Sequence, residues 1–172
     1  CETDKFNTVT CKMFVQQDLA ADTASSTALI PALLKRGSQK FPSTRQIARE
    51  LEYLHAASFS ADVLKIGERQ LMEFYFDMVD PSLLPDGEEN WKRGLETFWD
   101  IALNPVTQGQ AFVQEYFDQE KTNLRREVEG LVNNKRAYAL ARAVEFMCAD
   151  EPYGVYKYGS ADGIEALENA PT

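Results

Sequence analysis

Two extended segments separated by only two residues restrict the fold of this chain more than any other feature. Residues 58–66 and 69–79 both read as strands, and Gly67-Glu68 between them has the length of a tight β-hairpin loop. Strand side chains point alternately to the two faces of a sheet. In the second strand one alternating set is entirely apolar, and we expect it to face the core: Met72, Phe74, Phe76 and Met78.

The other periodic segments supply one further strand and several helices. Pro31 lies inside the first predicted helix and lacks an N–H donor, so we expect a kink or a late start there. Gly130 and Asn133-Asn134 are expected to bend or split the longest helix. This order favours an α+β domain, with helices packed on one face of an antiparallel sheet. The expected strand covers residues 7–15, and the helices run from Asp22 to about Arg36, Ser43 or Thr44 to Leu54, Asn90 to Leu103, about Ala111 to Cys148, and onward from Ser160.

The net charge of −9 argues against nucleic acid as a partner. A nucleic-acid binder needs a basic stripe to replace phosphate counterions, and here basic pairs such as Arg125-Arg126 are interleaved with acids. No apolar run approaches the roughly 20 residues of a membrane helix, so we expect no membrane partner. The apolar fraction of 44% is enough for a real core, and the whole chain, 1–172, is expected to form a single domain.

Cysteine and histidine usage excludes several kinds of site. Cys1, Cys11 and Cys148 are widely separated and odd in number, which favours a reducing, cytoplasmic location over a disulfide framework. His55 is the only histidine, so the chain alone cannot build a zinc site with two His ligands. We expect His55 to be structural. The chain begins at Cys1 without Met, and we expect it to be part of a longer protein.

Four segments spread over nearly the whole chain carry a family resemblance. They are Leu33–Ser38, Glu50–Ala61, Asn104-Pro105 and Phe117–Leu124. Together they resemble the N-terminal half-domain of the insulinase/pitrilysin metallopeptidases, which are inverted-motif zinc enzymes. The resemblance implies a LuxS/metallopeptidase-like half-domain, and a longer chain with a second, similar half.

A narrower set of motifs resembles one bacterial branch of this family. The set consists of Glu120-Lys121, Asn134–Ala139, Glu145–Cys148 and Glu151–Gly154. Members of that branch lack the zinc motif and are typically found beside a zinc-bearing paralogue. The resemblance therefore implies a homologous zinc-bearing half or subunit as the partner.

In the active enzymes of this family, two His on adjacent helical turns bind zinc and a Glu between them acts as general base. Those three positions fall here on Ala28, Pro31 and Ala32, none of which can bind a metal or accept a proton. The position of the third ligand falls on Glu127, two helical turns after Glu120 and on the same helix face. We therefore expect no catalytic residue, metal site or cofactor, and Glu127 and Glu120 remain residual candidates or ordinary helix-face acids.

These observations predict a catalytically inactive peptidase-like domain that completes a peptide-binding chamber. Family substrates add as a strand to a sheet edge, so extended peptides are a further expected partner. Tyr153, Tyr156 and Tyr158 either line a peptide groove or pack at the end of the domain. Two alternatives stay open: a non-catalytic scaffold subunit of another complex, and an active zinc peptidase with ligands that these patterns do not identify.

Overall fold

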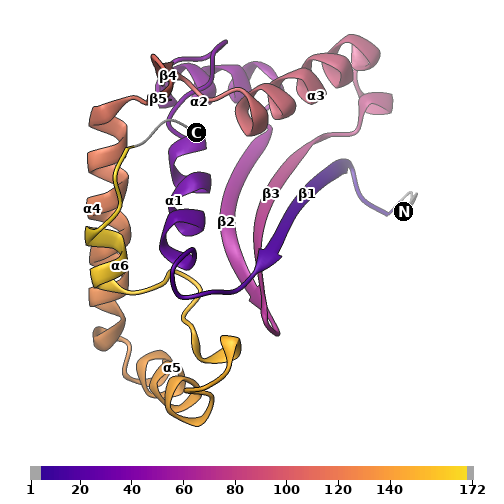
Figure 1. Ribbon diagram of the computed structural model, residues 1–172. Coiled ribbons are helices and arrows are strands. Elements are labelled where there is room, and N and C mark those ends of the chain that lie inside the picture. The colour runs from indigo at the N-terminus through magenta and orange to yellow at the C-terminus, as the bar shows by residue number, and fades with distance from the viewer. Residues whose placement is uncertain (1–4, 170–172) are drawn as a thin grey trace.

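The computed structural model describes residues 5–169, and an antiparallel sheet forms one side of it (Figure 1). Within these residues the main sheet has three strands in the order β1-β3-β2: β1 (Thr8–Asp18), β2 (Ser58–Ile66) and β3 (Arg69–Val79). Both strands of the predicted hairpin have the predicted bounds, and Gly67-Glu68 forms the loop between them. Gly67 has a φ of 57°, which the first loop residue of a type II′ turn requires and which glycine adopts without strain.

The alternating apolar set of β3 faces the core as predicted. Phe74, Phe76 and Met78 are at most 2% exposed, and Met72 is half-buried. Phe76 contacts Phe98 of α3 (Gly87–Leu103) with ring centroids 5.8 Å apart. The α+β class is confirmed.

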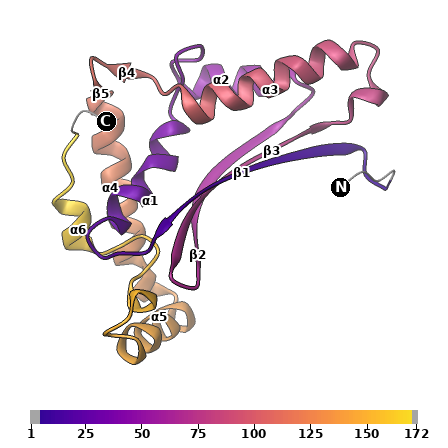
Figure 2. The ribbon, with the colours of Figure 1, turned by 45° about the vertical axis from the view of Figure 1, so that its right-hand side comes forward.

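Helices cover one face of this sheet. α1 (Ala24–Leu34) lies between the sheet and α4 (Gln114–Gly130), whereas α2 (Thr44–Tyr53) and α3 lie at one end of the molecule (Figures 1 and 2). The short α6 (Ala161–Glu165) packs against α4. Among residues 5–169, no helix has the length and apolarity that crossing a membrane requires.

The longest predicted helix is interrupted where its glycine and asparagines suggested. α4 ends at Gly130, a 3-10 turn η2 (Leu131–Asn133) follows, and α5 runs from Lys135 to Met147. Asn134 caps α5, because its side-chain oxygen accepts a hydrogen bond from the N–H of Ala137 at 3.1 Å.

Several predicted boundaries were wrong. Residues 111–112 form strand β5, which pairs with β4 (Thr107–Gln108) around Gly109, so the helix begins only at Gln114. α1 begins after Thr23 and without a side-chain cap, in place of the predicted cap at Asp22. α3 begins at Gly87, three residues before Asn90. The loop before it contains one 3-10 turn, η1 (Pro81–Leu83). Another 3-10 turn, η3 (Pro152–Gly154), follows α5.

A buried carboxylate joins α2 to α3. Glu50 is 6% exposed and accepts two hydrogen bonds from Arg93, at 2.5 Å from Nε and 2.7 Å from Nη2. Thr97 donates a weaker one at 3.4 Å. These bonds to Arg93 outweigh the cost of burial and hold the pKa of Glu50 below its ordinary value.

Glu50→Gln should destabilise the protein at neutral pH by about 1–2 kcal/mol, because a charge-assisted pair becomes a neutral one. A carboxylate with a lowered folded-state pKa stabilises the fold above its unfolded-state pKa, and this contribution disappears as the pH falls through the folded-state pKa. The difference from wild type should therefore shrink below pH 4.5. Urea unfolding at pH 7 and pH 3 measures both values. Glu52→Gln, on the exposed side of α2, is the control and should cost little at either pH.

Candidate functional site

The three positions that would carry the zinc motif lie in the middle of α1, on its mostly buried surface. Ala28 is 5% exposed, Pro31 is fully buried and Ala32 is half-buried. α1 packs on β2 and β3 through one side and on α4 through another. Pro31 lies inside the helix, which continues past it to Leu34. The Pro31 carbonyl still accepts a hydrogen bond from the N–H of Lys35, at 3.3 Å.

Glu120, one of the two candidate acids on α4, is engaged in an ion pair. Its Oε1 accepts from the guanidinium of Arg36, which follows the C-terminal end of α1. The Glu120 side chain is only 14% exposed and that of Arg36 is 28% exposed. The pair therefore ties α4 to the end of α1, and its carboxylate is not free to bind a metal.

Glu127, the position of the third ligand, is exposed on α4 beside two tyrosines. Burial, followed by the charges of Asp62 and Glu127, raises the pKa of Tyr158 far above its ordinary value. Burial, then Glu127 and Asp62, raises the pKa of Tyr156 in the same direction. Both phenols therefore stay protonated, and Tyr158 donates to the two oxygens of Asp62 at 3.1 and 3.2 Å. We call Asp62, Glu127, Tyr156 and Tyr158 the tyrosine–carboxylate cluster.

The residues at these positions do not fit a zinc ion. Two methyl groups and a proline ring stand where three donor or base side chains would be needed, and Glu127 supplies a single carboxylate. Ala28 and Tyr158 belong to the same buried apolar cluster, together with Leu29 and Leu124. Within residues 5–169 no three His, Cys, Asp or Glu side chains are grouped closely enough to hold a metal.

The three tyrosines sit on a segment that is fixed to β2, and we call residues 153–159 the C-terminal strap. Lys65 of β2 donates to the carbonyls of Tyr153 at 2.7 Å and Val155 at 3.0 Å. In the opposite direction, Lys157 donates to the Val63 carbonyl of β2 at 3.0 Å. Tyr158 is only 6% exposed, so its ring packs in the core and is not available to line an open groove.

A buried glutamine holds the strap to α1, and sequence reasoning missed it. Gln70 is fully buried, and its Nε2 donates to the carbonyls of Ala24 at 3.0 Å and Lys157 at 2.7 Å. Its Oε1 accepts from Gln17 at 3.2 Å. One signal was available, because Gln70 shares the alternating face of β3 with Phe74 and Phe76. A lone polar residue on such a face needs buried partners.

Other predicted features lie away from this region. His55 is exposed at the end of α2 with a φ of 57°, so it terminates a helix. Cys11 and Cys148 are half-buried free thiols, and Cys1 lies outside the described residues.

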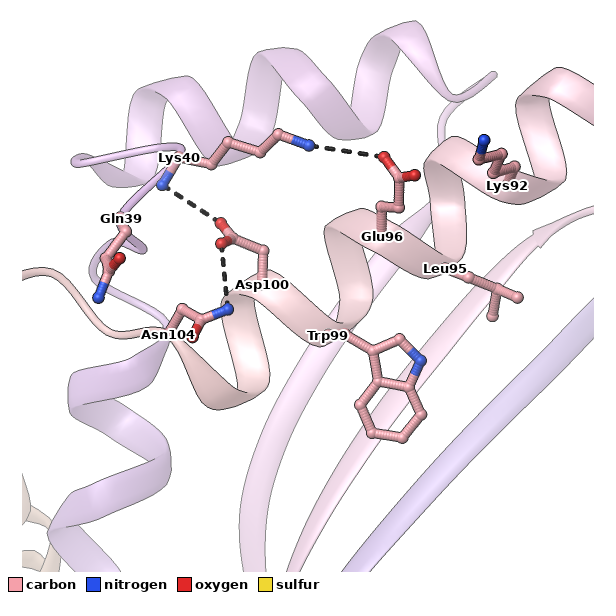
Figure 3. Close-up of a pocket in the computed structure, with 8 residues that line it drawn as sticks. All are labelled: Gln39, Lys40, Lys92, Leu95, Glu96, Trp99, Asp100 and Asn104. Atoms are coloured by element: carbon pink, nitrogen blue, oxygen red, sulfur yellow. Dashed lines mark hydrogen bonds and ion pairs between the residues drawn. The ribbon is translucent and has the colours of Figure 1, made fainter.

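A shallow recess beside α3 contains none of the predicted site residues (Figure 3). Lys40 pairs with Glu96 at 3.6 Å, and its main-chain N–H donates to Asp100 at 3.3 Å. Trp99 is 44% exposed and points away from this group in Figure 3. Lys40 already interacts with Glu96 and Asp100 in this recess, so it is a weaker candidate for chemistry than the α1–α4 region.

Known proteins are similar to the chain along almost its whole length. The probable inactive metalloprotease YmfF of Bacillus subtilis (strain 168) is 29% identical over 166 residues, which are 96% of this chain and 39% of that protein. A conserved protein from Enterococcus faecalis V583 has a TM-score of 0.88 and 24% identity, covering 97% of this chain and 39% of its own. A peptidase M16 inactive domain from Pseudomonas fluorescens has a TM-score of 0.71 and 14% identity, covering 98% and 37%.

No protein-family model matches the chain. The chain spans about two fifths of the length of each of the three proteins above. Both solved structures are under 25% identical, so they show a shared fold and nothing finer. The LuxS/metallopeptidase-like fold that the resemblance implied is therefore confirmed.

Gln70→Met should lower the free energy of unfolding by about 2 kcal/mol, because the hydrogen bonds that Gln70 donates to the carbonyls of Ala24 and Lys157 are lost. Chemical denaturation measures the loss. Gln16→Met on the exposed face of β1 is the control and should change stability by less than about 0.5 kcal/mol. Equal stability of the two variants would mean that the strap is not held by Gln70.

Proposed function

We propose that this chain, an inactive metalloprotease-like domain of the M16 (insulinase/pitrilysin) type, is a non-catalytic half of a peptide-binding chamber. Its partner is a homologous half or subunit that carries zinc. In this arrangement the partner cuts the peptide, and the present chain helps to enclose and hold it.

One observation carries the proposal: the helix that would hold the zinc motif keeps its place while its donors are gone. α1 still packs between the sheet and α4, but the three motif positions are Ala28, Pro31 and Ala32. A buried His or Glu without a metal would be costly to desolvate, whereas alanine and proline add to the core. The domain thus retains a peptidase's shape for a purpose other than cutting.

Two further features support the partner and ligand classes. The chain spans about two fifths of the relatives it matches, which leaves room in such a protein for a second half of similar size. The sheet ends in two edge strands, β1 and β2. An edge strand can add an extended peptide through main-chain hydrogen bonds, and this mode of binding needs no zinc.

After exposure to zinc and desalting, the purified chain should retain close to zero zinc ions per chain. It should not cleave an unstructured test peptide. Elemental analysis and a fluorogenic peptide assay measure the two quantities. One zinc per chain, lost in Glu127→Ala together with metal-dependent cleavage, would establish an active enzyme and contradict the proposal. Glu129→Ala, on the same helix, is the matched control.

Co-expression with a zinc-bearing M16 homologue from the same organism tests the pairing. We expect a 1:1 complex by light scattering, and a kcat/KM for peptide cleavage roughly tenfold above that of the homologue alone, a change of about 1.4 kcal/mol. No complex and no change in cleavage would overturn the pairing. Stable assembly with proteins unrelated to peptidases would favour the scaffold alternative.

A further inference from the structure

Among residues 5–169, α5 is the long helix that the domain leaves largely uncovered. None of its residues, Lys135 to Met147, is buried. Figures 1 and 2 both show it at the end of the molecule opposite α2 and α3, beyond the end of α4. Its main contacts are with the flanking 3-10 turns η2 and η3. A 13-residue helix is marginally stable by itself, so α5 depends on whatever contacts its surface.

Successive helix residues are about 100° apart, and on that spacing α5 has two separate apolar faces. Ala137, Ala141 and Val144 are half-buried and form the face that contacts the domain. A second face points to solvent, and its large side chains are Leu140, Phe146 and Met147, which are 67%, 87% and 80% exposed. We call this second face the exposed α5 face; it consists of Ala139, Leu140, Ala143, Phe146 and Met147. A contiguous apolar patch on a surface helix indicates an interaction site.

The sequence around this face is self-complementary when it is reversed about Ala143. In an antiparallel pair centred there, Ala139 lies opposite Met147, and Leu140 lies opposite Phe146. The small Ala139 then faces the large Met147, and the two copies of Ala143 meet at the axis, which permits close packing of the helices. The charges follow the same rule. Lys135 and Arg136 begin α5, whereas Asp150 and Glu151 lie at the reversed sequence positions, in the turn that follows the end of α5 at Met147.

We propose that the exposed α5 face binds the same face of a second copy of this chain, antiparallel and with a two-fold axis at Ala143. Such a contact is isologous and closes after two copies. Arg136 of one copy then approaches Asp150 of its partner, and this occurs twice per pair. The proposal is independent of the pairing with a zinc-bearing homologue, because it rests on α5 and the turn that follows it.

The charges at the two ends of α5 favour a second copy over an anionic membrane. An anionic membrane would attract Lys135 and Arg136 but repel the chain as a whole, which carries −9. A second copy brings Lys135 and Arg136 of one chain toward Asp150 and Glu151 in the turn after α5 of the other. Because the patch is small compared with a standard interface of about 800 Å² per partner, we expect a weak, reversible dimer.

Sedimentation velocity of the 172-residue chain from about 10 to 500 μM, with a reductant present to keep Cys148 a free thiol, tests this directly. We expect a reversible monomer–dimer equilibrium. Phe146→Glu should weaken dimerisation at least tenfold without changing the circular dichroism spectrum, since Phe146 is 87% exposed. Phe14→Glu on β1 replaces another exposed phenylalanine and should leave the equilibrium unchanged.

A charge-reversal cycle identifies the antiparallel register. Arg136→Glu should weaken the dimer, and Arg136→Glu combined with Asp150→Arg should restore it, with both effects declining at high salt. A wild-type chain that stays monomeric over the whole range overturns the proposal. So does a dimer that neither Phe146→Glu nor Arg136→Glu weakens. Flotation of a monomeric chain with phosphatidylserine vesicles, lost in Phe146→Glu, would assign the face to a membrane instead.

Discussion

The apolar face of β3 is the constraint on which the rest of the structure depends. β3 pairs along its whole length with β1 on one side and β2 on the other, so its alternate side chains are fixed toward a single helix layer. Phe76 and Met78 are the deepest of these, and α3 approaches so closely that Gly94 lies against Met78. A Cβ at Gly94 would be 2.6 Å from the Met78 sulfur. Packing of α3 at this distance then places Arg93 within reach of Glu50 on α2, which fixes the second helix.

The same layer explains how a peptidase-type domain tolerates the absence of a zinc motif. α1 lies between the sheet and α4, where a metal would bridge the two helices in an active relative. Here the bridge is an ion pair, Arg36 with Glu120, and a packed aromatic ring, Tyr158, in the cluster that also contains Ala28. A cavity lined by unpaired donors would be costly, whereas a filled apolar contact is favourable. Of the positions that the resemblance assigns to the motif, Ala28 and Pro31 are thus part of the core.

The sequence pattern predicted those features of the fold that depend on residues close together in the chain. The β3 alternation, the Gly67-Glu68 loop and the Asn134 break were all readable because each depends on neighbours within a few residues. The contacts of the candidate site were not readable. Asp62 and Tyr158 are 96 residues apart, and Arg36 and Glu120 are 84 apart, so no window along the chain contains both partners. The positions of Ala28, Pro31 and Ala32 came from resemblance, and the structure adds that they are packed.

If the function of a domain depends on its shape, the positions most sensitive to substitution should differ from those of an active enzyme. In an active enzyme a few acids and bases carry the activity, and exposed apolar residues matter little. Here Glu120 is engaged in an ion pair and Glu127 lies beside two tyrosines. Surfaces that meet other chains, such as the exposed α5 face, would carry the function instead. Selection on such a protein should therefore act on packing and on interfaces, where exchanging a phenylalanine for a glutamate does more harm than neutralising an acid.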